Sequence, residues 1–466
     1  DRKNCISIFF FCFFDTNIVL FKQKRILRGD RMPKKHRKRK NSYLFFSIAV
    51  LAVVIGFLGF LTLKISTADS LNKETSTSNV SSQSEPEFKE TTARVMSIGD
   101  IMVHSPQLSG ALNSATGEYN FDCYFKEIAP YFAASDLNVG NLEVTFGGNE
   151  GREFSGYPLF NTPDSLADSI KNAGFNLLLT SNNHCYDTGL AGLKRTAQVL
   201  KQKEIEFTGT KETDRDPSYV IKQVNNISIG IINYTYETKC LTEGRKYLNG
   251  NPVNPEANGL INSFNYDKLD AFYAEIGAYL KEMEAKGAEF KVVYLHWGNE
   301  YQTYSNTYQK SIAQTLCNMG VDMIIGSHPH VIQPIELLTS EDSQNTTVCL
   351  YSMGNAVSNQ RQELMTSCPT GHTEDGMIFE FVLKKTKAGV HLESLSLTPT
   401  WVNKYLVNGK YNYTIYPIEN PNDLGKYSFN STALSKAQKS YERTREIVAE
   451  GLTACQQSIG CPVTFK

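Results

Sequence analysis

Residues 267–296 read DKLDAFYAEIGAYLKEMEAKGAEFKVVYLH, a helical pattern followed directly by a strand pattern. In the first part the apolar positions recur three or four residues apart, which predicts an amphipathic helix over 267–286. The run KVVYLH, residues 291–296, is short and apolar and predicts a buried strand. Helix and strand in this order form the repeating unit of α/β proteins.

Apolar runs and helical patterns alternate along much of the chain. The apolar runs lie at 94–99, 175–180, 227–232 and 321–326, and helical spacing occurs at 163–173 and 189–203. This alternation predicts the α/β class, with a sheet that is at least partly parallel and covered by helices. After residue 332 the chain contains strand patterns without helices between them and then a polar helix, at 332–338, 347–351, 377–384, 391–398 and 433–450. We expect these late strands to extend the sheet in antiparallel fashion.

The charges are unevenly distributed along the 466 residues, although the net charge is only −1. Residues 1–64 contain 14 Lys and Arg and 3 Asp and Glu, which gives a net charge of +11. The remaining residues contain 33 basic and 45 acidic side chains, which gives −12. Because nucleic-acid binding requires positive potential, we expect no nucleic acid among the partners.

The N-terminal part has the features of a single-pass membrane protein. Residues 44–63, LFFSIAVLAVVIGFLGFLTL, are uncharged and match the roughly 20 apolar residues that a bilayer requires. The basic cluster KKHRKRK at 34–40 predicts that residues 1–43 are cytoplasmic and that the chain after the span lies outside the cell. The alternative is a cleaved signal peptide, but its apolar region would be only about 7–15 residues long. We therefore predict an uncleaved transmembrane helix at 44–63.

The sequence further suggests how the rest of the chain is divided. We expect translation to start at Met32, so that residues 1–31 are not part of the translated protein. Residues 64–93 are rich in Ser, Thr and Glu and predict a flexible stalk. A folded domain at 94–400 and a C-terminal extension at 401–466 complete the predicted organisation.

Polar motifs follow the ends of several apolar runs and contain five of the eight histidines. They are GDIMVH (99–104), NVGNLE (138–143), SNNHCYDTG (181–189), LHWGNEY (295–301) and GSHPH (326–330). Each motif alone has an ordinary explanation, such as a helix cap or a turn. Together they bring imidazole, carboxylate and amide groups to the carboxyl ends of strands, where loops of an α/β sheet converge on one crevice. Because these groups are ligands of divalent metals, the sequence predicts a metal site.

With these motifs the sequence resembles the CapA (PgsA) family of capsule synthesis proteins, whose domain is related to the calcineurin-like metallophosphoesterases. The resemblance covers residues 94–360 and rests on GD-I-M, NLE, NNH-x-x-D-x-G, H-W-G-x-E-Y, G-S-H-P-H-x-x-Q and Y-S-M-G-N in the family's order. It implies a four-layer α/β/β/α sandwich and an anchored surface protein for poly-γ-glutamate capsule synthesis or export. The implied partners are the cytoplasmic membrane, the capsule polymer and the capsule-synthesis membrane proteins.

The resemblance also implies ligands for one or two divalent ions, with Mn, Zn or Fe as plausible identities. Asp100 would bind one metal and Glu143 would take the bridging position. The other implied ligands are Asn183 and His296 on the second metal, and His328 and His330, which complete the two sites.

His184 would act on the reacting group rather than on the metal, and Asp187 would orient it. Two departures from the phosphoesterase pattern affect the site. Met102 stands where the phosphoesterases have a histidine, and His104 is the candidate to replace it. Glu143 stands where they have the shorter aspartate.

Two classes of function remain open. The first is a component of capsule synthesis or export, and the second is a metal-dependent hydrolase at the cell surface that acts on phosphoester, amide or ester bonds. Because poly-γ-glutamate is a polyanion, a domain with a net charge of −12 would repel it unless metals or a basic patch reverse the local field. Lys239, Arg245 and Lys246 are the candidates for such a patch.

Overall fold

The computed structural model describes residues 88–239, 242 and 244–466. The predicted cytoplasmic segment, the predicted transmembrane helix and the predicted stalk up to residue 87 lie outside this range. No helix among the described residues is both long and apolar enough to cross a bilayer. The first strand, β1 (Thr91–Ile101), begins within the last residues of the range predicted as the stalk.

The larger of two main sheets contains β1 at its centre. Its order is β17 (Lys410–Pro417), β16 (Gly389–Val407), β15 (Asp375–Thr386), β1, β2 (Leu137–Leu142), β3 (Leu177–Leu179) and β4 (Glu206–Thr208), with β14 (Asn355–Val357) beside β1 and β18 (Val463–Phe465) beside β16. The strands β1 to β4 pair in parallel, whereas β15, β16 and β17 pair in antiparallel fashion. The sheet is therefore mixed.

The second main sheet is also mixed. Its order is β12 (Ile335–Thr339), β13 (Thr346–Leu350), β11 (Met323–Ser327), β10 (Phe290–His296), β6 (Ile227–Tyr236) and β5 (Tyr219–Val224), with β9 (Ser263–Phe264) beside β6. Its central strands β13, β11, β10 and β6 pair in parallel. A separate ribbon pairs β7 (Tyr247–Leu248) with β8 (Asn251–Pro252).

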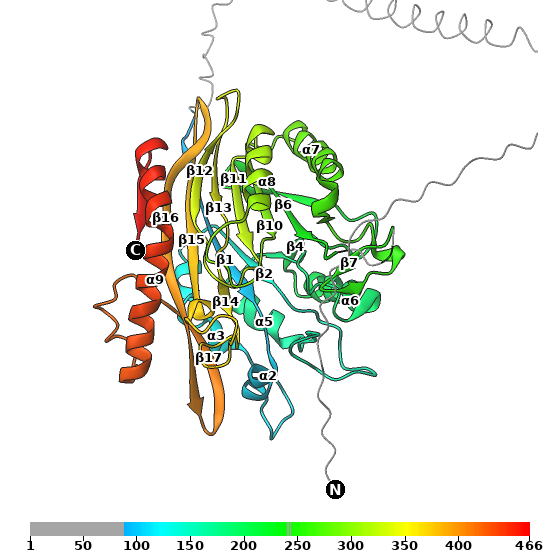
Figure 1. Cartoon of the computed structure of the whole chain (residues 1–466), viewed down its shortest axis with the longest axis vertical. Helices are drawn as coiled ribbons and strands as arrows, with labels where there is room; N and C mark the ends of the chain where they lie inside the picture. The colour runs from blue at the N-terminus through cyan, green and yellow to red at the C-terminus, as the bar shows by residue number, and fades with distance from the viewer. Residues whose placement is uncertain (1–87, 240–241, 243) are drawn as a thin grey trace, which may run out of the picture. The chain divides into compact units, whose positions relative to one another are not determined.

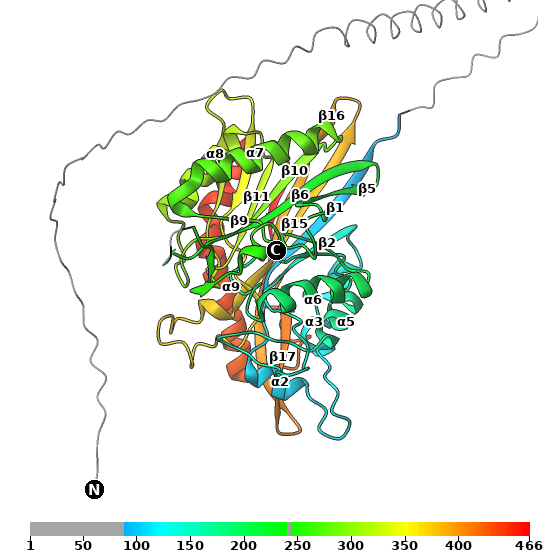
Figure 2. The ribbon, with the colours of Figure 1, turned by 90° about the vertical axis from the view of Figure 1, so that its right-hand side faces the viewer.

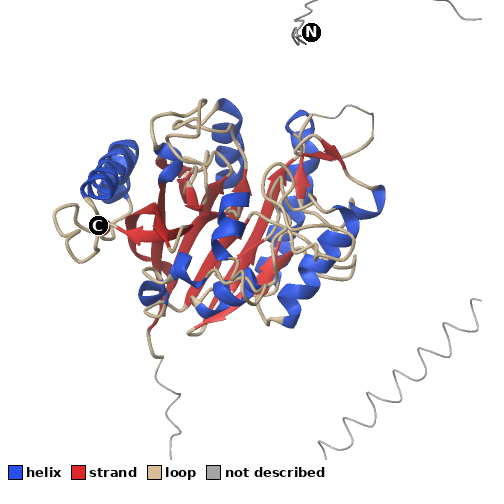
Figure 3. Ribbon diagram, turned by 90° about the horizontal axis from the view of Figure 1, so that it is seen from below, coloured by secondary structure: helices blue, strands red, loops and turns tan. Residues whose placement is uncertain are grey.

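Helices cover both sheets. They are α2 (Ser105–Ala111), α3 (Asp122–Phe125), α4 (Ala129–Phe132), α5 (Ser165–Asn172), α6 (Gly189–Gln202), α7 (Leu269–Ala285), α8 (Thr307–Asn318) and α9 (Ser431–Ser458), with short 3-10 turns at Pro255–Ala257, Tyr266–Lys268 and His372–Glu374. Figure 2 shows α7 and α8 along the strands β6, β10 and β11, and α5 and α6 beside the other sheet. Figure 3 shows strands in the interior and helices around them.

The buried apolar side chains account for this layering. One cluster joins residues of both sheets, such as Val95 of β1 and Val292 of β10. A second joins the larger sheet to α2–α6, and a third joins the smaller sheet to α7 and α8. The order of layers is helix, sheet, sheet, helix, and the α/β class predicted from the sequence is confirmed.

The region after residue 400 belongs to the same compact unit as the sheets. The predicted boundary between residues 400 and 401 falls inside β16. The helix α9 is longer than the predicted 433–450 and packs Val448 and Leu452 into the cluster between the sheets. A Cβ on its Gly451 would lie 1.7 Å from the backbone oxygen of Ile335 in β12, so helix and strand are in close contact. Figure 1 shows α9 along the edge of the larger sheet.

Candidate metal centre

The residues predicted as metal ligands meet at the carboxyl ends of parallel strands from both sheets. In the larger sheet, Asp100 of β1 pairs in register with Asn141 of β2 and with Asn355 of β14. In the smaller sheet, His296 is the last residue of β10 and pairs with Ser327, the last residue of β11. The other predicted residues lie in the loops that follow β2, β3 and β11, namely Glu143, Asn183, His184, His328 and His330.

Two glycines allow the backbone to approach closely at this point. A Cβ on Gly99, directly before Asp100, would lie 1.8 Å from the backbone oxygen of Gly354. A Cβ on Gly326 would lie 1.9 Å from the backbone oxygen of Tyr351. These contacts explain why glycine precedes the polar residue in the GD and GSHPH motifs.

The loop after β11 holds two histidines in an unusual backbone conformation. His328 has a φ of 97° and His330 has a φ of 57°, both in the left-handed region that side chains with a Cβ rarely adopt. Such residues cost free energy and persist where the surrounding structure or a function requires them. The surrounding structure holds both histidines, whose side chains are buried, in this conformation.

Glu143 is the least satisfied polar group of the site. Its side chain is fully buried, and neither carboxylate oxygen accepts a hydrogen bond. His296 Nε2 lies 3.4 Å and His330 Nε2 lies 3.9 Å from Glu143 Oε1. Burial raises the pKa of Glu143 well above its usual range, and the charge of Asp100 acts in the same direction. A cation at this position would remove the cost of the buried, unpartnered carboxylate.

Two histidines beside Glu143 are neutral. Burial lowers the pKa of His296 to about 3 and lowers that of His328 well below its usual value, and neighbouring histidines add to both effects. His328 Nδ1 is buried and has no hydrogen-bond partner. A neutral imidazole with an unpartnered nitrogen is the form that binds a metal ion.

Asp100 and His330 differ from these groups because they contact each other. Their closest atoms, Asp100 Oδ2 and His330 Nδ1, lie 3.1 Å apart. Burial raises the pKa of Asp100, but the hydrogen bond with His330 and the positive charge of His330 outweigh it and lower the pKa overall. The same contact raises the pKa of His330 despite its burial. Asn141 Nδ2 also donates to Asp100 Oδ1, at 2.7 Å. Asp100 is therefore held in its charged form.

The ligand atoms form two groups that share one carboxylate. Asp100, Glu143 and His296 have donor atoms within 4.8 Å of one another, and so do Glu143, His328 and His330. Because Glu143 belongs to both groups, it lies where the family resemblance puts a bridging ligand. The first group pairs Asp100 with His296, whereas the resemblance assigns these two residues to different metals.

The chemistry of these donors fits a divalent metal. Each group combines carboxylate oxygen with imidazole nitrogen, the ligand set of borderline ions such as Zn, Mn and Fe. Asn183 Oδ1 lies 2.7 Å from His296 Nε2, so the amide that the sequence predicted as a ligand lies beside the first group.

His184 and Asp187 form a separate pair at the same crevice. His184 Nδ1 lies 2.7 Å from Asp187 Oδ2, and the backbone N–H of Phe160 donates to the same oxygen at 2.7 Å. Burial raises the pKa of Asp187, against the effect of His184. Within the described residues, neither group of metal donors includes His184. The pair can hold or move a proton at the imidazole.

Met102 and His104, which belong to the first departure noted in the sequence, are both packed into the fold. Met102 is 1% exposed and belongs to the apolar cluster under α2–α6. His104 Nδ1 accepts a hydrogen bond from the backbone N–H of Asn359 at 3.2 Å, and burial lowers its pKa to about 4. Within the described residues, His104 belongs to neither donor group.

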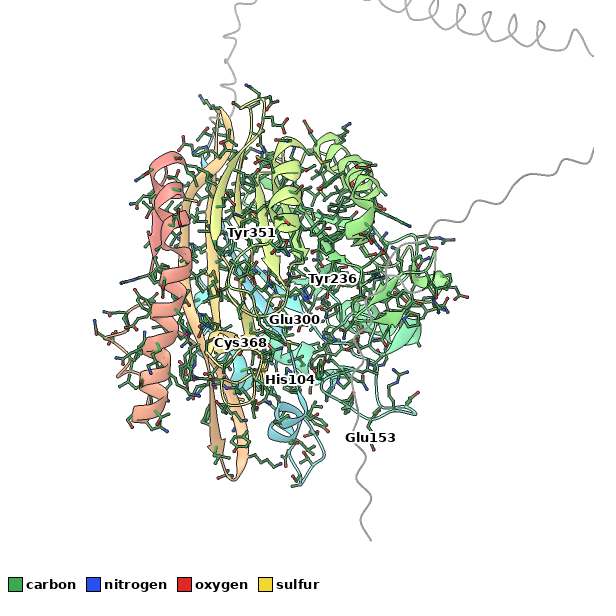
Figure 4. All side chains as sticks on the ribbon, viewed as in Figure 1. His104, Glu153, Tyr236, Glu300, Tyr351 and Cys368 are labelled. Atoms are coloured by element: carbon green, nitrogen blue, oxygen red, sulfur yellow. The ribbon has the colours of Figure 1, made fainter. Side chains whose placement is uncertain are left out.

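Several residues around the site were not predicted from the sequence. The Ser327 hydroxyl lies 3.0 Å from His296 Nδ1, and the ring of Tyr236 lies 4.7 Å from that of His328. Glu300 follows β10, and its charge raises the pKa of Glu143 further. Figure 4 labels Tyr236 and Glu300 near the centre of the view. Glu300 is part of the LHWGNEY motif, which could have indicated it, whereas Tyr236 and Ser327 have no such signal.

Comparison with known proteins places the site in a family context. The family model described as "Bacterial capsule synthesis protein PGA_cap" matches residues 94–360, more than half of the chain and all of the predicted ligands. The "PGA biosynthesis protein CapA" of Bacillus subtilis (strain 168) is 26% identical over 364 residues, which are 77% of this chain and 81% of the relative. The "Capsule biosynthesis protein CapA" of Bacillus anthracis is 27% identical over 267 residues, 56% of this chain and 59% of the relative.

Proposed function

The chain belongs to the PGA_cap family of bacterial capsule synthesis proteins, and from this premise we propose that it acts in the synthesis or export of a poly-γ-glutamate capsule. The observation that carries the proposal is the family match over the residues that build the crevice. The names of the two CapA relatives agree with it. The proposal includes a single-pass anchor at residues 44–63 that leaves the folded part outside the cytoplasmic membrane.

We further propose that the crevice is a divalent metal centre. Glu143 would bind a single ion or bridge two ions. Asp100 and His296 would be the ligands on one side of Glu143, and His328 and His330 those on the other. Asn183 would complete the coordination next to His296. A bound divalent metal would supply Lewis-acid polarisation of a substrate oxygen. The unpartnered carboxylate of Glu143 and the neutral imidazole of His328 support this assignment.

A second candidate function is a metal-dependent hydrolase at the cell surface, acting on phosphoester, amide or ester bonds of the envelope. It is favoured by one observation, the His184–Asp187 pair beside the donors but outside the ligand groups. Asp187 would hold the imidazole in orientation, and His184 would protonate a leaving group. In this case the metallophosphoesterase-like site would catalyse hydrolysis. An export component would use the same residues only to bind its ligand.

The capsule proposal is tested by complementation of a gene deletion in a bacterium that carries this gene and makes the polymer. Wild type and Glu450→Gln, an exposed glutamate of α9, should restore surface poly-γ-glutamate. Glu143→Gln should not restore it, because both donor groups lose the shared carboxylate. Normal capsule in the Glu143→Gln strain would refute the role of the crevice. Release of the folded part by external protease, after removal of the cell wall, tests the anchor, and complete protection would refute it.

The hydrolase alternative is tested with purified full-length protein and a nitrophenyl phosphate diester. If the site turns over, His184→Ala should lose activity by about 10²–10⁴-fold, as expected for removal of an acid–base group, and keep its metal content. Equal inactivity of wild type and variant on every ester would leave the binding role as the function of the crevice.

A further inference from the structure

A cavity lies in the C-terminal part of the described chain. Its volume is about 930 Å³, and we call it the C-terminal cavity. It is bounded by the hairpin of β16 and β17, by the loop that leads to α9 and by the first turn of α9; representative lining residues are Arg361, Trp401, Lys404, Tyr411, Lys426 and Thr432. Figure 1 shows these elements next to one another. None of the predicted metal ligands lines it.

The lining of the C-terminal cavity is positive, although the chain after residue 64 is strongly acidic. Five cationic and two anionic side chains line it, namely Lys126, Arg361, Lys404, Lys426 and Lys436 against Glu127 and Glu363. The cations come from distant parts of the sequence, so the fold has gathered them. A concave site with this excess of positive charge attracts anions.

Two of these cations have no carboxylate partner within the described part of the chain. Lys404 Nζ lies 4.3 Å from the centre of the Tyr411 ring and donates to Asn359 Oδ1 at 3.2 Å. Lys426 Nζ lies 5.1 Å from the centre of the Tyr427 ring. Burial lowers the pKa of Lys404, and this effect outweighs the opposing charge of Glu363. The charge of Arg361 acts in the same direction as burial. An anion beside Lys404 would oppose both effects.

Arg361 and the helix α9 each contribute a further feature. Arg361 is only 2% exposed and pairs with Glu374 at 2.8 Å, but its Nε has no hydrogen-bond partner. The helix α9 begins at the cavity with Asn430 as its N-cap, and its first turn contains no acidic residue. The N-terminal end of a long helix carries a partial positive charge that favours an anion.

The aromatic lining restricts the kind of anion. Tyr405, Tyr411, Tyr416, Tyr427 and Phe429 surround the amines, and such faces pack against methylene groups. A chain of γ-linked glutamate carries one carboxylate per residue, and two methylene groups lie along its backbone in each repeat. Its carboxylates could contact the lysine amines, and its methylene groups could contact the aromatic side chains that also line the cavity.

We propose that the C-terminal cavity binds a segment of γ-linked polyglutamate through Lys404 and Lys426, separately from the metal centre. The identity of the polymer rests on the proposed function, whereas the preference for a carboxylate-bearing chain rests on the cavity. The basic residues suggested by the sequence do not form this site. One of them, Lys246, lies 3.6 Å from Glu237 Oε1, and none of the three lines the cavity.

The test measures binding of a synthetic γ-linked glutamate oligomer to purified full-length protein by fluorescence anisotropy. Lys404→Gln/Lys426→Gln should lower the affinity by about tenfold or more, because two charge-assisted contacts are lost. The control Lys310→Gln/Lys387→Gln removes the same charge from exposed positions outside the cavity and should bind like wild type. Lys426→Glu, at an exposed residue, should weaken binding without affecting the fold.

Other outcomes would overturn the inference. They are the absence of binding by wild type, an equal loss in the control, or unchanged affinity in the double variant. Glu143→Gln separates this inference from the proposed function, because it removes the shared metal carboxylate and leaves the cavity intact. If Glu143→Gln lost oligomer binding and Lys404→Gln/Lys426→Gln kept it, the polymer would bind at the metal centre, and only the cavity assignment would fail.

Discussion

The carboxylate of Glu143 belongs to both donor groups, whereas that of Asp100 belongs to one. Glu143→Gln should therefore leave less bound metal than Asp100→Asn, as measured by elemental analysis of the purified proteins. Wild type should also lose stability when the metal is chelated, by about 2.7 kcal/mol if the free metal had been at 100 times its Kd. Equal metal content in wild type and Glu143→Gln would contradict the shared ligand.

His328 offers a direct measure of backbone strain, because its φ is 97°. His328→Ala and His328→Gly both remove the imidazole, but only glycine adopts this conformation without steric cost. In excess chelator, His328→Gly should be more stable than His328→Ala by about 1 kcal/mol, despite the greater chain entropy of unfolded glycine. Chemical denaturation of both variants gives the comparison. A more stable alanine variant would show that the loop is relaxed.

His104 predicts a pH dependence of stability. Its pKa is lowered to about 4 in the folded protein, compared with about 6.5 in an unfolded chain. Below pH 6.5 the unfolded state binds the proton first, so the contribution of His104 is complete above this pH and is lost as the pH falls toward 4. Relative to His104→Gln, wild type should lose on the order of 1–2 kcal/mol over this range, since the ring keeps some contact with solvent. A difference that does not change with pH would contradict the lowered pKa.

Among the elements, α9 packs so closely against β12 that a single added methyl group should disturb it. An alanine in a helix is normally more stable than glycine by about 1 kcal/mol. Gly451→Ala should have the opposite effect, because its Cβ would lie 1.7 Å from the backbone oxygen of Ile335. We expect a loss of about 1–3 kcal/mol in thermal unfolding. Gly425→Ala is the control, because no atom lies within 4 Å of its Cβ position, and a loss of equal size there would contradict the contact.

The elements differ in how far the sequence predicts them. The runs at 94–99, 227–232 and 291–296 lie inside β1, β6 and β10, because strands buried on both faces are continuously apolar. The strand β17, KYNYTIYP, was missed because its polar and aromatic residues give no apolar run. The helix α8 was missed because polar residues separate its buried positions Ile312 and Leu316.

The sequence also predicts the metal centre only in part, but for a different reason. The motifs predicted which residues gather, since each follows a strand. That Glu143 lies near both His296 and His330 was implied by the family resemblance, and not by the motif spacing, because that contact depends on how the two sheets pack. The C-terminal cavity could not be predicted, because Lys126 and Arg361 are far from the lysines at 404, 426 and 436 in the sequence.

For the whole molecule, the last residues complete the core between the sheets. Val448 and Leu452 of α9 belong to that cluster, and β18 pairs with β16. A chain that ends at Pro417 should therefore fail to unfold cooperatively and should be digested rapidly by protease. Protease resistance equal to that of wild type would show that the sheets are stable without α9.

This arrangement determines when the protein can fold during its synthesis. A ribosome releases β1 long before its partner β15, and α9 and β18 emerge last. Until then α9 and β18 do not cover the apolar side chains between the sheets, and this exposed apolar surface can aggregate. If this part of the chain crosses a membrane, as we propose, it emerges on the far side before its fold is complete. A chaperone there would protect the incomplete fold from aggregation. A premature stop codon near the end of the gene would then abolish the protein rather than shorten it.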